Sequence, residues 1–310
     1  MNPESGSPAP IFILGLLPRS GTNHLWDLLG LHPDTELMRP VYEDHLVRWT
    51  PHLRHYVEDV SRRWSPEWEV GENEAAELLF ALGDGVASWV TGGSQRRVVT
   101  KMPSVENAKL FFDVFRSSPL VVIVRDGRSL AESGARTFGW TYEHAFRRWA
   151  EGAQTVIDLQ RTAPTDRFCL VRYEDLVERP RDTVRDVCEH SGLDPDTFPY
   201  DRIEELPVRG SSTLARQGGG VHWELTEKPA DFAPVERWES WSPHLHRRFE
   251  RLAGAQQRAL SYGLVSPSGS DSARERFDDV QDHARAIYRE THEKLGRLRR
   301  AVLRAQNGSS

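Results

Sequence analysis

Cysteine is scarce in this sequence, which has only two among its 310 residues, Cys169 and Cys188. Cys169 lies in an apolar run typical of a strand, and Cys188 lies in a stretch with helical character. Neither shows the spacing of a metal-ligand set. We therefore expect both to be small buried residues, and we expect no metal centre.

Long hydrophobic segments are absent as well. No apolar run approaches the roughly 20 residues that a membrane-spanning helix needs. Residues 1–10 are polar, contain glycine and proline, and lack the apolar core of a signal peptide. These features predict a soluble, cytoplasmic protein without a membrane partner, in which residues 1–10 form a flexible N-terminal segment.

An excess of positive charge is also missing. The 40 lysines and arginines are outnumbered by 46 acidic residues, so the net charge is −6. General nucleic-acid binders have a basic excess, and we expect no nucleic-acid partner here. Local basic clusters can still bind a small anionic ligand. A chain of this length suits one large α/β domain with appendages.

The most informative stretch begins at residue 11. The apolar residues 11–14 predict a buried strand, and large apolar residues at helical spacing over 25–29 predict a helix. The polar turn between them combines a fixed positive charge, a glycine that permits close backbone approach and several hydrogen-bond donors. Such a unit aims amide groups at an anion, and we interpret it as a phosphate or sulfate cradle. Its residues are Arg19, Ser20, Gly21, Thr22 and Asn23.

Two observations limit this interpretation. Serine and threonine at a strand-to-helix turn often serve only to cap the helix. The loop also lacks the G-x-x-x-x-G-K-[ST] pattern of a Walker A loop, because no lysine stands at the helix entry. A nucleotide kinase is therefore disfavoured.

Strands alternate with helices along most of the chain, which predicts an α/β fold with a central parallel sheet and helices on both faces. We expect this domain to span residues 11–265. A linker rich in serine and glycine then precedes a long charged helix at 271–305 with coiled-coil-like apolar spacing. The other predicted strands are 97–102, 119–124 and 167–172, and the other predicted helices are 46–63 (kinked at Pro51), 72–90, 105–115, 141–161, 180–190 and one from Pro243 onward.

Ligands of parallel sheets bind outside the carboxyl ends of the strands, so the loops after these strands should converge on one site. Functional side chains also stand at the ends of the other predicted strands. Lys101 is at the end of the second strand, Arg125, Arg128 and Ser133 follow the third, and Tyr173 follows the fourth. Several cations and hydroxyls at one edge describe a polyanion site. For any single arginine, a surface ion pair is the ordinary alternative.

These residues resemble the sulfotransferases that use 3′-phosphoadenosine-5′-phosphosulfate (PAPS). The family's 5′-phosphosulfate loop, P-[KR]-S-G-T-[TS], is similar to residues 18–23. Its 3′-phosphate motif, R-D-x-R with a serine eight residues after the first arginine, is similar to residues 125–133, and its Y-E-D motif to residues 173–175. A late basic loop resembles residues 209–212. The resemblance covers about residues 10–263 and implies a P-loop-like fold.

The resemblance also implies roles. Arg19 and the amides of residues 20–23 would hold the 5′-phosphate and the sulfuryl oxygens, and Lys101 would stabilise the bridging oxygen. PAPS would be the co-substrate and 3′-phosphoadenosine 5′-phosphate (PAP) the product, with no metal. The family's 3′-phosphate contacts would correspond to Arg125, Ser133 and Arg209, and its adenine-side tyrosine to Tyr173. Its closing loop would include Arg209, Gly210 and Ser211.

The sequence departs from the family pattern at two places. Asn23 replaces the commoner threonine or serine. The catalytic histidine that follows the lysine in cytosolic members is absent, since Met102 and Pro103 follow Lys101. The chain therefore looks closer to the bacterial and tyrosylprotein members, which use a glutamate.

A hydroxyl acceptor requires a general base, and three adjacent residues are candidates. Glu43 is the first choice by analogy with the glutamate-using members. His45 has a suitable ordinary pKa, and Asp44 completes the set. The alternative is that these residues cap a helix beginning near Leu46, which Asp44 fits best. Glu43, His45, Lys101 and Arg19 form the predicted catalytic set.

The sequence thus predicts a PAPS-dependent sulfotransferase that acts on a hydroxyl of a small molecule, glycan or peptide. The alternatives are a non-catalytic nucleotide-binding module and a P-loop kinase-like phosphotransferase. Segments 35–70 and 208–245 should shape the acceptor site, but they carry no readable code. The C-terminal helix suits either a homodimer or a monomer on which it docks.

Overall fold

The computed structural model describes residues 7–68, 72–209, 225–226, 235, 238–265, 277 and 281. The chain divides into two units, one of residues 1–240 with 252–264 and one of residues 241–251 with 265–310. All described candidate site residues belong to the first unit. The predicted helix at 271–305 lies outside the described residues, apart from 277 and 281, and the domain boundary at 265 stays a prediction.

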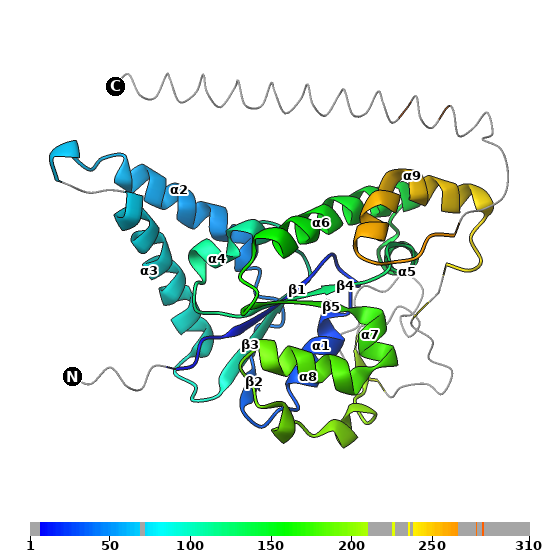
Figure 1. Cartoon of the computed structure of the whole chain (residues 1–310), viewed down its shortest axis with the longest axis horizontal. Coiled ribbons are helices and arrows are strands. Elements are labelled where there is room, and N and C mark those ends of the chain that lie inside the picture. The colour runs from blue at the N-terminus through cyan, green and yellow to red at the C-terminus, as the bar shows by residue number, and fades with distance from the viewer. Residues whose placement is uncertain are drawn as a thin grey trace. The chain divides into compact units, whose positions relative to one another are not determined.

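A five-stranded sheet forms the centre of the first unit (Figure 1). Its strand order is β2-β3-β1-β4-β5, and every neighbouring pair is parallel, as the sequence predicted. Of the five strands in this sheet, only β2, which is three residues long, was not expected. The strands are β1 (Ile11–Gly15), β2 (Thr35–Leu37), β3 (Arg97–Met102), β4 (Leu120–Val124) and β5 (Phe168–Arg172).

Helices cover both faces of this sheet. Figure 1 shows α1, α7 and α8 on one face and α4 and α6 on the other. A separate two-stranded antiparallel ladder joins β6 (Val208–Arg209) to β7 (Leu225–Thr226). The helices are α1 (Thr22–Leu29), α2 (Thr50–Ser61), α3 (Glu72–Thr91), α4 (Phe111–Val114), α5 (Gly127–Phe138), α6 (Tyr142–Thr162), α7 (Tyr173–Glu178), α8 (Pro180–His190) and α9 (Pro243–Ala259).

The core follows from the alternation of side chains along β1. Ile11 and Ile13 enter a buried cluster that includes apolar residues of α1 and α8. Phe12 points to the other face, where its ring centroid lies 5.2 Å from that of Phe111 and 4.7 Å from that of Phe115. A strand buried on both faces needs a continuous apolar run, which is the pattern that identified this strand in the sequence.

Two helix predictions were wrong in detail. The predicted kinked helix 46–63 is a short 3-10 turn at Val47–Trp49 followed by α2, and Pro51 lies in the first turn of α2. Proline fits there because the first turn leaves its N–H groups without intrahelical partners. The predicted helix 105–115 is a 3-10 turn at Ala108–Leu110 followed by the single turn of α4.

Both cysteines are buried free thiols, as predicted. Burial raises the pKa of Cys169 and of Cys188 to about 12. We expect neither thiol to react with a disulfide reagent at pH 8 in the folded protein, since the thiolate is the nucleophile, and both to react in denaturant. Thiol titration with and without denaturant measures this, and one fast-reacting native thiol would contradict it.

Candidate functional site

The strand register brings the predicted loops together. Leu14 pairs with Met102, Gly15 with Ile123, and Val124 with Arg172. The segments that follow β1, β3, β4 and β5 therefore leave the same edge of the sheet, and the segment after β5 is α7, which begins directly at Tyr173. The predicted convergence of these loops is confirmed.

The loop after β1 is held by its own serine. The Ser20 hydroxyl donates to the Leu17 carbonyl oxygen (2.7 Å) and accepts from the Leu17 N–H (3.1 Å), and the Ser20 N–H also donates to that carbonyl (3.1 Å). The Ser20 amide is thus already engaged, and the amides of residues 21–23 are better placed to meet a ligand. Arg19 has φ 82°, a left-handed backbone conformation that is rare for residues other than glycine. Strained conformations of this kind cluster at functional sites.

The first loop meets the loop after β4 through two arginines. The Arg19 Nε donates to the Ser133 hydroxyl oxygen at 3.0 Å, and the Arg125 Nη1 donates to the Arg19 carbonyl oxygen at 3.0 Å. The Arg125 guanidinium also lies 4.6 Å from the ring centroid of Tyr173. The structure therefore brings together four residues that the sequence placed on three separate strand ends.

Tyr173 also packs against the first loop at Gly21. A Cβ at position 21 would lie 2.3 Å from Cδ2 of Tyr173, and Gly21 has φ 108°. Both the contact and the backbone conformation therefore require glycine here. The tyrosine ring is wedged between the β1 loop and Arg125.

A second cluster lies at the end of β3. The Lys101 Nζ is 4.0 Å from the Glu43 Oε1, and the His45 Nε2 is 3.8 Å from the Glu43 Oε2. The Lys101 side chain is 1% exposed, and burial lowers its pKa to about 8, with the Glu43 charge opposing that shift. Glu43 is more exposed than Lys101, at 28%, so it can meet both the buried lysine and an acceptor that arrives from solvent.

Asp44, between the two other candidate bases, is fully engaged in the fold. Its Oδ2 accepts from the Thr100 hydroxyl at 2.5 Å, and its Oδ1 accepts from the Leu46 N–H at 2.6 Å. Burial raises the pKa of this carboxyl. No helix begins at Leu46, and Asp44 caps neither the 3-10 turn nor α2; its carboxylate instead holds the turn before Val47–Trp49. Glu43 and His45 therefore remain as candidate bases.

Arg209 lies beside this second cluster. Its Nε and Nη2 donate to the Asp27 carboxylate at 3.2 and 3.3 Å, and its guanidinium lies 5.8 Å from the Trp26 ring centroid. Burial raises the pKa of Asp27, while Arg209 and Lys101 oppose that shift. Sequence patterns did not reveal Asp27, whose only signal is an acidic residue between the apolar residues Trp26 and Leu28. The assignment of Arg209 to the 3′-phosphate stays a prediction.

The remaining candidate residues are Asn23, Gly210 and Ser211. Among the described residues, the buried Asn23 Oδ1 has no hydrogen-bond partner. Gly210 and Ser211 lie outside the described residues. In the described part of the chain, no three histidine, cysteine or acidic residues are grouped to hold a metal ion, and no helix has the length and apolarity to cross a membrane.

A cavity of about 450 Å³ lies at the opposite edge of the sheet. Its lining includes Pro10 and Ser118, which precede β1 and β4, and Asp84 and Arg116. The cavity is therefore at the amino ends of the strands and contains none of the candidate site residues.

A family model described as "Sulfotransferase family" matches residues 10–197. A protein-tyrosine sulfotransferase of Drosophila melanogaster is 20% identical to this chain, and the match covers 76% of this chain and 52% of that protein. This chain thus spans about half the length of that curated relative.

A solved sulfotransferase domain has the same fold. The sulfotransferase domain of the Synechococcus PCC 7002 olefin synthase has a TM-score of 0.50 and 22% identity, with 86% of this chain and 99% of that chain covered. Mouse sulfotransferase SULT7A1, solved as a complex with PAP, has a TM-score of 0.42 and 12% identity, covering 90% of this chain and 91% of that one.

Proposed function

Because this chain belongs to the sulfotransferase family, we propose that it transfers the sulfuryl group of PAPS to an acceptor hydroxyl. The observation that carries the proposal is the contact of Arg19 with Ser133 and of Arg125 with the Arg19 carbonyl. These contacts join the two predicted phosphate sites of the donor. A donor with phosphates at both the 5′ and 3′ positions matches such a paired site.

Each part of the pair has a separate task. Arg19 and the amides of residues 21–23 bind the 5′-phosphate and the sulfuryl oxygens, and Arg125 with Ser133 binds the 3′-phosphate. Arginine suits these roles because its planar fork binds two phosphate oxygens at once. The face of Tyr173, packed against Gly21 and Arg125, supports the adenine side of the donor.

The second cluster supplies the proton transfer. The Glu43 carboxylate accepts the proton of the acceptor hydroxyl, whose oxygen attacks the sulfur in line with the bond to the bridging oxygen. That sulfur–oxygen bond breaks, and its electron pair leaves with the 5′-phosphate of PAP. The Lys101 ammonium, buried 4.0 Å from Glu43, stabilises the charge that develops on the bridging oxygen.

Donor binding and turnover test this proposal directly. We expect isothermal titration calorimetry to show tighter binding of PAP than of ATP with Mg²⁺. Radiolabelled PAPS should then transfer its label to at least one acceptor in a panel of phenols, glycans and tyrosine peptides. Tighter binding of ATP with Mg²⁺ would contradict the proposal and favour a kinase-like enzyme, whereas PAP binding without any transfer would favour a non-catalytic module. The acceptor class and the cytoplasmic location stay predictions.

The lowered pKa of Lys101 predicts an alkaline limb in the pH–rate profile. Since burial lowers that pKa to about 8, the free enzyme loses the ammonium above this pH. We expect kcat/KM for PAPS to fall about tenfold per pH unit above this pKa. We expect kcat to fall only at higher pH, because the bound anionic donor favours the charged form of the lysine.

Lys101→Arg provides the control for this profile. Arginine stays charged throughout the accessible pH range, so the limb should disappear whatever the absolute rate of the variant. An unchanged limb in Lys101→Arg would assign it to another group.

A further inference from the structure

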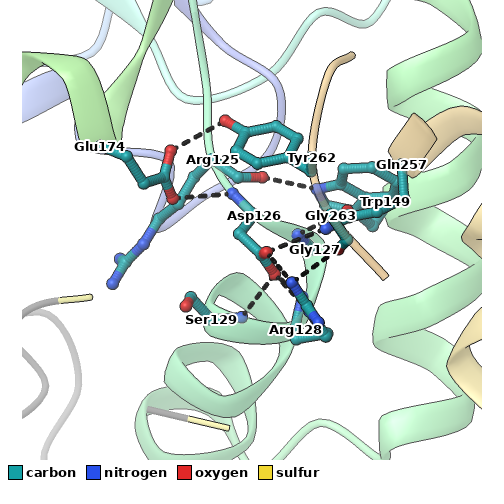
Figure 2. A network of polar contacts seen from close by, with 10 residues as sticks. All are labelled: Arg125, Asp126, Gly127, Arg128, Ser129, Trp149, Glu174, Gln257, Tyr262 and Gly263. Carbon is teal, nitrogen blue, oxygen red and sulfur yellow. Dashed lines mark hydrogen bonds and ion pairs between the residues drawn. The ribbon is translucent and has the colours of Figure 1, made fainter. Parts of the chain in front are cut away.

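Three successive backbone groups at the start of α5 are held by buried side chains from elsewhere in the chain. The Trp149 Nε1–H donates to the Arg125 carbonyl oxygen at 3.0 Å. The Asp126 N–H donates to the Glu174 Oε1 at 3.0 Å, and the Gly127 N–H donates to the Gln257 Oε1 at 3.2 Å. Figure 2 shows the Glu174 contact on one side of the turn and the Trp149 and Gln257 contacts on the other, with the Arg125 side chain extending away from Trp149 and Gln257.

Gln257 uses both ends of its amide in this network. While its oxygen accepts from Gly127, its Nε2 donates to the Asp126 Oδ2 at 2.9 Å. Asp126 in turn caps α5 by accepting from the Arg128 N–H at 2.8 Å, and its carboxylate also pairs with the Arg128 guanidinium. Gln257 has no exposed surface, so these bonds are shielded from bulk water.

The residues after Gln257 add two more contacts. The Tyr262 hydroxyl donates to the Glu174 Oε2 at 2.9 Å, and the Arg128 Nη2 donates to the Gly263 carbonyl oxygen at 2.9 Å. The Tyr262 ring lies under the Arg172 guanidinium, 4.3 Å away. Burial raises the pKa of both Glu174 and Tyr262, so the tyrosine stays a hydrogen-bond donor throughout the ordinary pH range.

From these contacts we infer that Gln257 and Tyr262 are positioning residues for recognition of the donor's 3′-phosphate. We call residues 257–263 the rear brace. None of these hydrogen bonds involves the side chain of Arg125 or of Ser133. The rear brace holds the backbone from Arg125 to Gly127. This backbone sets the direction in which the Arg125 side chain leaves the end of β4, and it positions the start of α5, the helix that carries Ser133. The inference rests on the proposed function, because it concerns the same donor site.

A brace of this kind has a specific energetic signature. Orientation of Arg125 and Ser133 acts directly on a 3′-phosphate, whereas it reaches the 5′ half of the site only through their contacts with Arg19 in the loop after β1. A loss of the brace should therefore weaken binding of PAP more than binding of adenosine 5′-phosphate (AMP), which lacks the 3′-phosphate. A general loss of folded protein would weaken both ligands by the same factor.

Gln257→Glu is the test variant. The glutamate has the same shape, but its carboxylate cannot donate to the Asp126 Oδ2 and places a like charge beside it. We expect the ratio of the AMP dissociation constant to the PAP dissociation constant to fall about tenfold, in line with the loss of one buried hydrogen bond to a charged group. At saturating PAPS, kcat should change far less than KM for PAPS.

Gln256→Glu is the matched control. Gln256 is the neighbouring residue and makes one exposed hydrogen bond, to the Gln154 Oε1 at 3.3 Å, so the same substitution there should leave the ratio unchanged. If Gln257→Glu does not fold, Tyr262→Phe carries the test, since it removes only a hydroxyl, and a fall in the ratio of about threefold is expected.

The outcomes separate the two proposals. A folded Gln257→Glu or Tyr262→Phe variant with the wild-type ratio overturns the rear brace, as does an equal loss of PAP and AMP affinity. Wild-type protein that binds PAP no more tightly than AMP overturns the proposed function, and the brace inference with it. A lowered ratio in both variants and an unchanged ratio in Gln256→Glu supports the brace.

Discussion

Replacement of Glu43 by glutamine is expected to lower kcat by about 10²- to 10⁴-fold, the range that a lost general base produces. Glutamine keeps the shape of the side chain but cannot accept the acceptor's proton. PAP affinity should be unchanged or slightly higher, because the lost negative charge lies 4.0 Å from the Lys101 ammonium. Steady-state kinetics with labelled PAPS and calorimetry with PAP measure the two effects separately.

The control for this prediction is Glu36→Gln. Glu36 lies on β2 and makes an exposed ion pair with Arg96 at 3.3 Å, so its loss should leave kcat near the wild-type value. Retention of kcat in Glu43→Gln together with its loss in His45→Ala would transfer the role of base to His45. Loss of kcat in neither variant would show that the second cluster does not supply the base.

Substitution of Gly21 by alanine is expected to abolish measurable PAP binding and to destabilise the fold. The new Cβ would lie 2.3 Å from Tyr173 Cδ2, and the backbone has φ 108°. The left-handed conformation alone costs about 1–2 kcal/mol, and the collision forces either the loop or the tyrosine to move. Because this loop and Tyr173 both belong to the donor site, either movement removes binding. Calorimetry and denaturant unfolding measure the two consequences.

Gly139→Ala isolates the conformational part of that effect. Gly139 also has a positive φ, 66°, but a Cβ there would meet nothing within 4 Å. We expect a modest loss of stability of about 1 kcal/mol and normal PAP binding. Equal effects of the two substitutions would show that the contact with Tyr173 is unimportant, and normal PAP binding by Gly21→Ala would contradict the placement of the cradle.

Much of the fold was predictable because its signals are local. The apolar runs of β1 and β4 are buried completely, and runs of that kind indicate strands covered on both faces. The helices at 105–115 and 46–63 were predicted less well, since apolar content alone does not distinguish a helix from a 3-10 turn. β2 was missed because three residues at a sheet edge have no readable period.

The candidate site was predictable to the extent that its residues stand at strand ends. Arg19, Lys101, Arg125 and Tyr173 each follow or end a strand, and parallel strands bring their carboxyl ends together. The residues that support them were not predictable. Asp27 has no motif, and although Asp126 and Glu174 lie within motifs, the sequence does not say which backbone groups they hold.

The sequence by itself therefore determined which strands form and which charged residues stand at their ends, because strand patterns and turns arise from neighbouring residues. Tertiary structure alone decided the partners of those charges: Arg19 with Ser133, Arg209 with Asp27, and Asp126 with Gln257. In the last pair the residues are 131 positions apart. A hydrogen bond of that separation leaves no periodic trace in the sequence, because it forms only after packing has brought two distant segments into one buried site.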